Sequence, residues 1–381
     1  MVPWPGLACR GGGDVPRIRV LDTHHGFIQL PAFLPDATRG TIRSVPTHLL
    51  EQAGVEILMA NALHLSERPG AEAVQALGGI HRFMGWSGPV ATDSGGFQVW
   101  SMARDRGGSG TVTNKGFVLP KTSGRGKRLF TPERAIGHQL KLAPDIVFCL
   151  DQCTHPDDPP EVQAASVQRT LRWARRCREV LDQRASDRRP LLFAVVQGGA
   201  DPELRRRCVD GLLEIGFDGY GFGGVPIAGD GRSLVDEIGL VAELLPPGVP
   251  LHALGVGRPD SVLAAWRAGW RTFDSVAPTR EARRGLLYTP TVALEDRAAV
   301  AGAERVSRYL DATDEAAWRQ TEPVDPTCGC PLCRRYSRGY LAHLFRIEDP
   351  AASVLATLHN LAFLGRLITT LRAIEDVDGS C

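Results

Sequence analysis

The segment Thr272–Arg280, with the sequence TFDSVAPTR, places a carboxylate where an apolar strand ends. Phe273 and Val276 are typical strand residues, and Pro278 then prevents a continued ladder because it has no N–H to donate. Asp274 is therefore expected at the strand end, and three arginines follow it closely. Two interpretations are open on this segment alone. Asp274 is either a capping carboxylate near solvated arginines or a reactive group placed beside a polyanion.

Short apolar runs alternate with helical stretches along the chain, which indicates parallel strands joined by crossover helices. The runs expected to form strands are 31–35, 56–60, 89–92, 146–150, 192–196, 220–222, 251–254 and 271–273. Helices are expected at 47–53, 71–77, 132–142, 161–184, 202–215, 234–245 and 259–268. Eight strands, most followed by a helix, predict an α/β fold of the (β/α)8 TIM-barrel class. A doubly wound sheet is the alternative, but no glycine-rich phosphate-binding fingerprint follows the first strand.

A barrel of this class carries its active residues at the carboxyl ends of the strands. Nearly every expected strand here is followed by a polar side chain or by glycine. These positions are Asp36, Asn61 with His64, Asp93, Asp151, Gln197, Gly223–Gly224, Gly255–Gly257 and Asp274. Polar strand ends also form turns, so each position alone is a weak signal. Together they predict one shared site at the mouth of the barrel.

Composition sets broad limits on function. The 381 residues carry a formal net charge of +1, so any contact with nucleic acid must come from a local basic cluster. No apolar run is expected to be long enough to span a membrane. Residues 1–20 lack a signal-peptide pattern and are expected to form a disordered lead-in to a cytoplasmic protein.

Three of the nine cysteines lie together, at Cys328, Cys330 and Cys333. Thiolates at such short spacing indicate a zinc ion or an iron–sulfur cluster. No fourth cysteine lies at usable spacing, so a histidine is expected to complete a Cys3His site, and His343 and His359 are both candidates. A closed site of this kind is structural rather than catalytic. Three free thiols are the alternative.

Two carboxylates at one barrel mouth, Asp93 and Asp274, are typical of glycosidic-bond chemistry, with one nucleophile and one acid/base. Glycines follow Asp93 and let a flat ligand approach the backbone, and Phe97 could stack on that ligand. Asp151 and Gln197 add acceptors and donors for the edge of a heterocycle. The alternative is that either carboxylate only caps the element after it.

These residues resemble the tRNA-guanine transglycosylases, also called queuine tRNA-ribosyltransferases, most closely the bacterial type. The resemblance covers residues 25–372. It is carried by DSGGFQ at 93–98, DQCT at 151–154, VQGG at 196–199, GVG at 255–257, FDSVAPTR at 273–280, the three clustered cysteines, YSR at 336–338 and HN at 359–360.

The resemblance implies an enzyme that exchanges guanine at the wobble position of the tRNA anticodon loop for a 7-deazaguanine, preQ1 or queuine, in queuosine modification. It implies a covalent ribosyl-aspartate intermediate on Asp274, the nucleophile, with Asp93 as acid/base. The implied base-binding residues are Phe97, Asp151, Gln197, Gly224 and Leu254, and the implied RNA-binding residues are Arg280 and Arg283. The implied ligands of one structural Zn²⁺ are Cys328, Cys330, Cys333 and His359, so the resemblance favours His359 over His343. A homodimer is also implied.

The expected domain organisation is a catalytic barrel at 21–290 and 350–376, with a zinc-binding subdomain at 291–349 inserted before the last helix. Three departures from the family pattern concern the pocket or its support: Gln152 where a carboxylate is usual, Pro226 in the segment at 223–230, and NALHL at 61–65. We expect Gln152 and Pro226 to alter the choice of incoming base. Two other functions stay open, namely base exchange on another 7-deazapurine or another nucleic acid, and a non-catalytic RNA-binding partner subunit.

Overall fold

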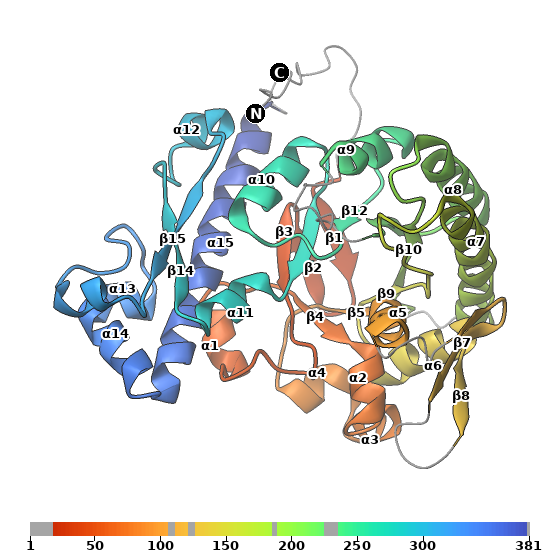
Figure 1. The fold of residues 1–381 in the computed structure, drawn as a ribbon, viewed down its shortest axis with the longest axis horizontal. Helices are drawn as coiled ribbons and strands as arrows, with labels where there is room; N and C mark the ends of the chain where they lie inside the picture. Colours follow the sequence, from red (N-terminus) through yellow and green to blue (C-terminus); the bar gives the residue numbers. More distant parts are fainter. Residues whose placement is uncertain (1–17, 106–110, 121–125, 185–188, 225–234, 379–381) are drawn as a thin grey trace.

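A computed structural model describes residues 18–105, 111–120, 126–184, 189–224 and 235–378. Within these residues, eight parallel strands form one sheet in the order β3-β13-β12-β11-β10-β9-β5-β4. Their bounds are β3 Ala32–Pro35, β4 Leu58–Asn61, β5 Val90–Asp93, β9 Ile146–Phe148, β10 Leu191–Val196, β11 Gly219–Phe222, β12 Leu251–Ala253 and β13 Thr272–Ser275. A parallel bridge between Asp36 and Met59 joins β3 to β4 and closes the sheet. The predicted (β/α)8 barrel is confirmed (Figure 1).

Helices follow the strands and surround the barrel (Figure 1). Their bounds are α1 Thr47–Gln52, α2 Ala62–Glu67, α3 Ala71–Ala76, α4 Gly79–Met84, α5 Gly96–Asp105, α6 Pro132–Leu142, α7 Pro160–Gln183, α8 Pro202–Ile215, α9 Val235–Leu244, α10 Pro259–Arg267, α11 Ala277–Ala282 and α15 Pro350–Asp378. The predicted ranges of α6 and α8 are confirmed at both ends. Proline at the first position and a capping side chain before it, Thr131 or Asp201, explain this agreement.

The segment after Phe273 differs from the sequence-based expectation. Asp274 lies within β13, which continues to Ser275. Val276, expected in the strand, has right-handed helical torsion angles and precedes α11. Pro278 lies in the first turn of that helix, where its missing N–H has no helical partner to lose.

A hairpin that the sequence analysis missed lies near the start of the described chain. Strands β1 Val20–Thr23 and β2 Gly26–Gln29 pair in antiparallel fashion, and Leu21 and Ile28 join the apolar cluster that fills the barrel. His25 in its turn contacts Asp145, just before β9, through its backbone N and its ring at 3.0 and 2.9 Å. The hairpin therefore lies at the amino ends of the strands, opposite the expected site. Most of the expected lead-in, residues 1–17, lies outside the described residues.

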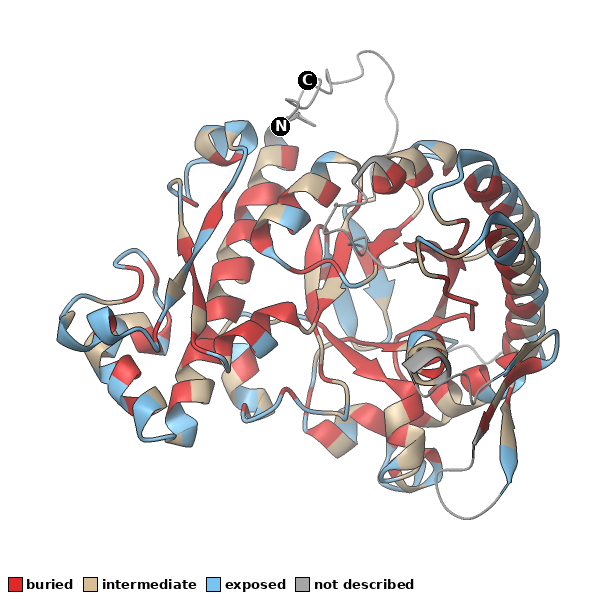
Figure 2. Ribbon diagram, viewed as in Figure 1, coloured by how far each residue is buried: buried red, intermediate tan, exposed pale blue. Residues whose placement is uncertain are grey.

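A second missed sheet consists of β6 Thr111–Thr113, β7 Gly116–Pro120 and β8 Lys127–Phe130, all antiparallel. Phe117 and Phe130 are buried in the main core, so this sheet packs against the barrel wall. Figure 2 shows the same pattern across the molecule: buried residues line the strands and the inner faces of the helices.

The polar segment after β13 contains a further antiparallel pair, β14 Leu286–Pro290 with β15 Ser307–Asp311. The connection between these two strands contains α12 Arg297–Gly302. After β15 come the 3-10 helix η1 Glu315–Arg319, α13 Pro331–Arg335 and α14 Arg338–Arg346. Strands β14 and β15 and helices α13 and α14 share an apolar cluster with Cys328, Cys330 and Leu332, whereas Val300 of α12 belongs to the main core. Helix α15 lies between this layer and the barrel (Figure 1).

Helix α15 corrects one expectation about membranes. By length and composition it is apolar enough to span a bilayer, although 61% of its most apolar window is buried inside the described structure. It also binds its surroundings through Asn360. The Asn360 Nδ2 donates to the carbonyls of Pro278 and Leu286 at 3.0 and 3.1 Å, and its Oδ1 accepts from Tyr288 N at 3.0 Å. The length and apolar composition of α15 are therefore those of a buried core helix.

Candidate active site and metal centre

Three carboxylates meet at the carboxyl ends of the strands. Asp93 ends β5, Asp274 lies in β13, and Asp36 directly follows β3. Strands β13 and β3 are paired with Asp274 opposite Leu34, so Asp36 lies two residues beyond the position opposite Asp274, at the same edge. The structure thus brings together the two carboxylates singled out in the sequence, and it adds a third.

Asp93 is in an environment that favours its protonated form. Burial, followed by the nearby charges of Asp36 and Asp274, raises the pKa of Asp93 from 3.8 to about 8. Hydrogen bonds from the Asn61 side chain, whose Nδ2 lies 2.7 Å away, and from the Ala62 backbone lower the pKa without cancelling this rise. A carboxyl group in this state holds a proton at neutral pH and is suited to general acid catalysis.

Asp274 has a different environment, in which two donors reach the same oxygen. His252 Nε2 lies 2.9 Å and Gly255 N 3.1 Å from Oδ1. Gly255 has a positive φ of 75°, a conformation that glycine adopts without strain and that helps aim its N–H at the carboxylate. Among the described residues, no hydrogen bond reaches Oδ2, and the side chain is 16% exposed. Oδ2 is therefore the oxygen available to a substrate.

Sequence reasoning missed His252 and did not assign Asp36 a role. His252 lies in a short apolar run of the kind that fills a barrel, and nothing in that run marks it as functional. Asp36 was one of many polar strand ends. Only the pairing of β12 with β13 and of β13 with β3 shows that both residues lie beside Asp274.

A second pair of side chains follows the neighbouring strands β9 and β10. Gln197 Nε2 donates to Asp151 Oδ2 at 2.5 Å, and both residues are buried. Burial raises the pKa of Asp151 to about 6, although the bond from Gln197 lowers it. The pair offers a carboxylate and an amide in fixed orientation, as a heterocycle edge requires.

The other predicted base-binding residues lie at the same end of the barrel but are not part of this pair. Phe97, in the first turn of α5, is 50% exposed and packs its ring 5.6 Å from that of Trp100. Leu254 follows β12 and is partly buried against the barrel interior. Gly224 follows β11 with a φ of 129°.

Gln152 bonds to helix α7 instead of adding to the hydrogen-bonding edge formed by Asp151 and Gln197. Its side-chain Oε1 accepts a hydrogen bond from Arg169 of α7, and its backbone N donates to Thr170 Oγ1 at 3.1 Å. Burial lowers the pKa of Arg169. Pro226, the other departure expected to alter base choice, lies outside the described residues.

Basic residues gather beside Asp274. Arg280 is exposed at the end of α11 and Arg283 follows it, partly buried. Burial, together with the positive charges of Arg43, Arg280 and Arg284, lowers the pKa of Arg283. Like charges held this close are typical of a site that binds an anion such as phosphate.

The three clustered cysteines and His359 form a second centre. Their ligand atoms all lie within 4.8 Å of one another. His359 Nδ1 is 3.6 Å from Cys330 Sγ and 3.3 Å from Cys333 Sγ, close to the edge of about 3.5 Å that tetrahedral Zn–S and Zn–N bonds would give. These residues could hold a metal ion, and His343 is not among them.

The opposite nitrogen of His359 supports this arrangement. His359 Nε2 lies 2.8 Å from the carbonyl oxygen of Tyr288 and must donate a proton to it. Nδ1 is then free of its proton in the neutral ring and faces the thiols. An outer hydrogen bond that fixes the tautomer in this way is typical of metal-binding histidines.

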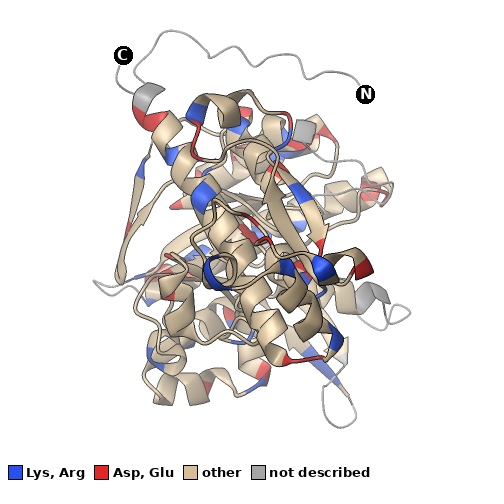
Figure 3. Cartoon of the chain, turned by 90° about the vertical axis from the view of Figure 1, so that its left-hand side faces the viewer, with Lys and Arg blue, Asp and Glu red and all other residues tan. Residues whose placement is uncertain are grey.

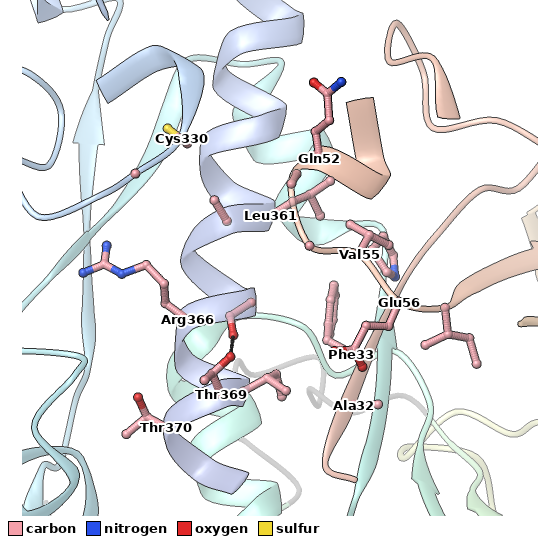
Figure 4. Close-up of a pocket in the computed structure, with 18 of the residues that line it drawn as sticks. Ala32, Phe33, Gln52, Val55, Glu56, Cys330, Leu361, Arg366, Thr369 and Thr370 are labelled. Carbon is pink, nitrogen blue, oxygen red and sulfur yellow. Dashed lines mark hydrogen bonds between the residues drawn. The ribbon is translucent and has the colours of Figure 1, made fainter. Parts of the chain in front are cut away.

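A pocket of about 520 Å³ lies between α15, β3 and the loop after α1 (Figure 4). Phe33, Val55 and Leu361 contribute to its apolar wall, and Cys330 and Arg366 lie along its edge. None of the three site carboxylates lines it. It is therefore separate from the candidate active site.

Comparison with known proteins agrees with this geometry. The family model described as Queuine tRNA-ribosyltransferase matches residues 13–376. Curated proteins named Queuine tRNA-ribosyltransferase are similar over most of both chains. The protein from Solidesulfovibrio magneticus is 39% identical over 97% of this chain and 93% of its own, that from Psychrobacter sp. 37% over 96% and 91%, and that from Novosphingobium aromaticivorans 36% over 94% and 90%. The chain belongs to the queuine tRNA-ribosyltransferase family.

Proposed function

We propose that this protein exchanges guanine in the anticodon loop of tRNA for a 7-deazaguanine, with Asp274 as nucleophile and Asp93 as acid/base. The observation that carries the proposal is the contrast between the two carboxylates. Asp93 holds a proton at neutral pH, while Asp274 accepts two hydrogen bonds on one oxygen and has none on the other within the described part of the chain. Unequal carboxylates at one site are what a double displacement requires.

In the first step, Oδ2 of Asp274 attacks the ribose C1′ and forms an ester. The bond from C1′ to the guanine nitrogen breaks, its electron pair stays with the base, and Asp93 supplies the proton that makes the base neutral. In the second step, Asp93 removes a proton from the incoming base, whose nitrogen attacks C1′ and displaces Asp274. Two inversions restore the original configuration at C1′.

The incoming base is proposed to lie over the Asp151–Gln197 pair. The Asp151 carboxylate accepts from N–H groups of a guanine-like edge, while Gln197 positions it. Phe97 is proposed to stack on the base with its exposed ring, and Gly224 and Leu254 are proposed to border the same space. Gln152 directly follows Asp151, and its side chain accepts a hydrogen bond from Arg169. We propose that Gln152, which departs from the family pattern, alters the choice of this chain among 7-deazaguanines such as preQ1 and queuine.

Arg280 and Arg283 are proposed to bind phosphates of the anticodon loop, because they lie directly after the nucleophile strand. The target base must leave its stack to reach Asp274, and a single-stranded loop makes this easiest. The protein is proposed to act in the cytoplasm, together with its proposed tRNA substrate.

The Cys3His centre is proposed to hold one structural Zn²⁺. Four protein ligands would leave no open position, so the ion would stabilise the layer beside α15 and take no part in the exchange. The chain is also proposed to divide into a catalytic barrel at 21–290 and 350–376 and a zinc-binding subdomain at 291–349, with β14 pairing across this boundary to β15.

A homodimer is proposed to form through the zinc-binding side. Large apolar side chains are exposed there on Trp318, Tyr340 and Ile347. Basic and acidic residues are interspersed over this side rather than segregated (Figure 3), which suits contact with another protein more than contact with a polyanion.

The proposal is tested by trapping the intermediate. Wild-type protein mixed with an anticodon stem-loop should give an RNA adduct on a denaturing gel, and the adduct should decay when guanine, preQ1 or queuine is added. The variant Asp274→Asn should give none, because an amide oxygen is a poor nucleophile. An adduct that persists in Asp274→Asn would refute the assignment of the nucleophile, and decay with guanine alone would refute the proposed 7-deazaguanine.

A further inference from the structure

A buried histidine contacts the proposed nucleophile but has no role in the two displacement steps. The His252 side chain is 2% exposed, and its Nε2 lies 2.9 Å from Asp274 Oδ1. Its other nitrogen, Nδ1, lies 3.0 Å from the hydroxyl of Thr272. That hydroxyl is in turn 3.0 Å from the carbonyl oxygen of Leu251. The four residues form a continuous chain that ends at the carboxylate.

Strand register explains why these side chains meet. Strands β12 and β13 are parallel, with His252 opposite Thr272. Asp274 lies two residues after Thr272, so both side chains point to the same face of β13, into the barrel. The Phe148 ring packs against the imidazole with centroids 5.1 Å apart. The imidazole is therefore held on three sides, and its Nε2 has little freedom to turn away from Asp274.

The direction of the hydrogen bond follows from chemistry. An ionised carboxylate has no proton to donate, so Nε2 must carry the proton and donate it to Oδ1. The Thr272 hydroxyl has a single proton: it either donates to the Leu251 carbonyl and accepts from Nδ1, or donates to Nδ1 and gives up the bond to that carbonyl. Nε2 donates to Asp274 in both arrangements. Gly255 N donates to the same oxygen at 3.1 Å. Oδ1 is thus occupied by two donors before any substrate arrives.

We propose that His252 is a positioning residue for base exchange, which binds Oδ1 of Asp274 and thereby directs Oδ2 at the ribose C1′. This inference rests on the proposed function. Its effect extends to the second step. Once Oδ2 is esterified, Oδ1 is the carbonyl oxygen, and the charge that returns to the carboxylate as the ester breaks is stabilised by the same two donors. His252 therefore acts in both formation and breakdown of the intermediate.

The test compares two substitutions of the same side chain in the full-length protein. His252→Leu fills similar space without a donor, whereas the amide N–H of His252→Gln can reach the position of Nε2. His48→Gln, at an exposed histidine on α1, is the matched control. For each protein, single-turnover rates of adduct formation and of adduct decay with added guanine are measured, together with kcat, KM for the stem-loop, and Tm.

His252→Leu should slow both rates about 10- to 100-fold, the effect of losing a hydrogen bond to a charged group, with KM changed less than about threefold. His252→Gln should recover most of the loss, and His48→Gln should match the wild type. Thr272→Val, which removes only the hydroxyl, should slow both rates by a smaller factor and serves if His252→Leu does not fold.

Three results would overturn the inference. Wild-type rates in His252→Leu would remove any role for the histidine. Equal losses in the Leu and Gln variants, with Tm lowered in both, would make it a packing residue. A raised KM with unchanged kcat would assign it to binding. If wild-type protein gives no adduct at all, the proposed function itself fails, whereas an adduct that Asp274→Asn abolishes and His252→Leu leaves unchanged refutes this inference alone.

Discussion

Replacing Asp93 by asparagine should change how the stability of this protein depends on pH. The fold holds the Asp93 proton up to a pKa of about 8, whereas the unfolded chain releases it near 3.8. Between these values the folded state binds one more proton than the unfolded state. Stability from this group is therefore fully present below the unfolded pKa and is lost as the pH rises toward 8. Asparagine has the same shape and no proton to lose.

The magnitude follows from one proton per molecule. The free energy of unfolding of Asp93→Asn minus that of the wild type should increase by about 1.36 kcal/mol per pH unit, or about 2.7 kcal/mol from pH 5 to pH 7. Other titrating groups are present in both proteins and largely cancel in the difference. The measurement is urea unfolding followed by circular dichroism at half-unit pH steps.

Asp210→Asn is the control, because it removes an exposed carboxylate on α8 by the same change of chemistry. Its stability should run parallel to that of the wild type over this pH range. A flat difference curve for Asp93→Asn would show that Asp93 is already ionised at pH 5 in the folded protein. It would then be unable to donate a proton to the leaving base, and the assignment of its role would be refuted.

Two further predictions concern the neighbouring carboxylate and the metal centre. Asp36→Asn removes a charge that raises the pKa of Asp93, so the alkaline limb of the pH–rate profile should move to lower pH by roughly 1 unit; an unchanged limb would contradict the coupling. Cys330→Ser should lower bound zinc from one ion per chain to less than about a tenth and reduce Tm by at least roughly 5 °C, while His343→Gln should leave both unchanged. Elemental analysis and thermal unfolding measure the two effects, and full zinc occupancy in Cys330→Ser would count against the Cys3His site.

The barrel could be predicted from the sequence because its signals are local. Each strand is a short apolar run closed by a polar residue or glycine, and helices such as α8 begin with a capping side chain followed by proline. The hairpins β1–β2 and β14–β15 escaped prediction because their strands lie within mixed or polar sequence. Their apolar residues are buried only by contact with distant elements, such as Leu21 against the barrel interior.

The site was predictable in its parts but not in its arrangement. The motifs around Asp93 and Asp274 identified both carboxylates. The raised pKa of Asp93 could not be predicted, because it depends on burial and on Asp36 and Asp274, which come from other strands. His252 gave no signal, since a histidine in an apolar run reads as a core residue. The position of His252 beside Asp274 depends on the register between β12 and β13, which only the folded chain defines.

The position of α15 has a consequence for synthesis of the protein. On a ribosome the barrel strands emerge long before α15, and domains begin to fold as they emerge. The backbone after the nucleophile strand, including Pro278 at the start of the helix that carries Arg280, gains its hydrogen bonds from Asn360 only when α15 has left the exit tunnel. In a nascent chain surrounded by tRNA, the arginines proposed to bind RNA would therefore lie beside a helix that still lacks these hydrogen bonds, and the proposed RNA-binding site would be completed last.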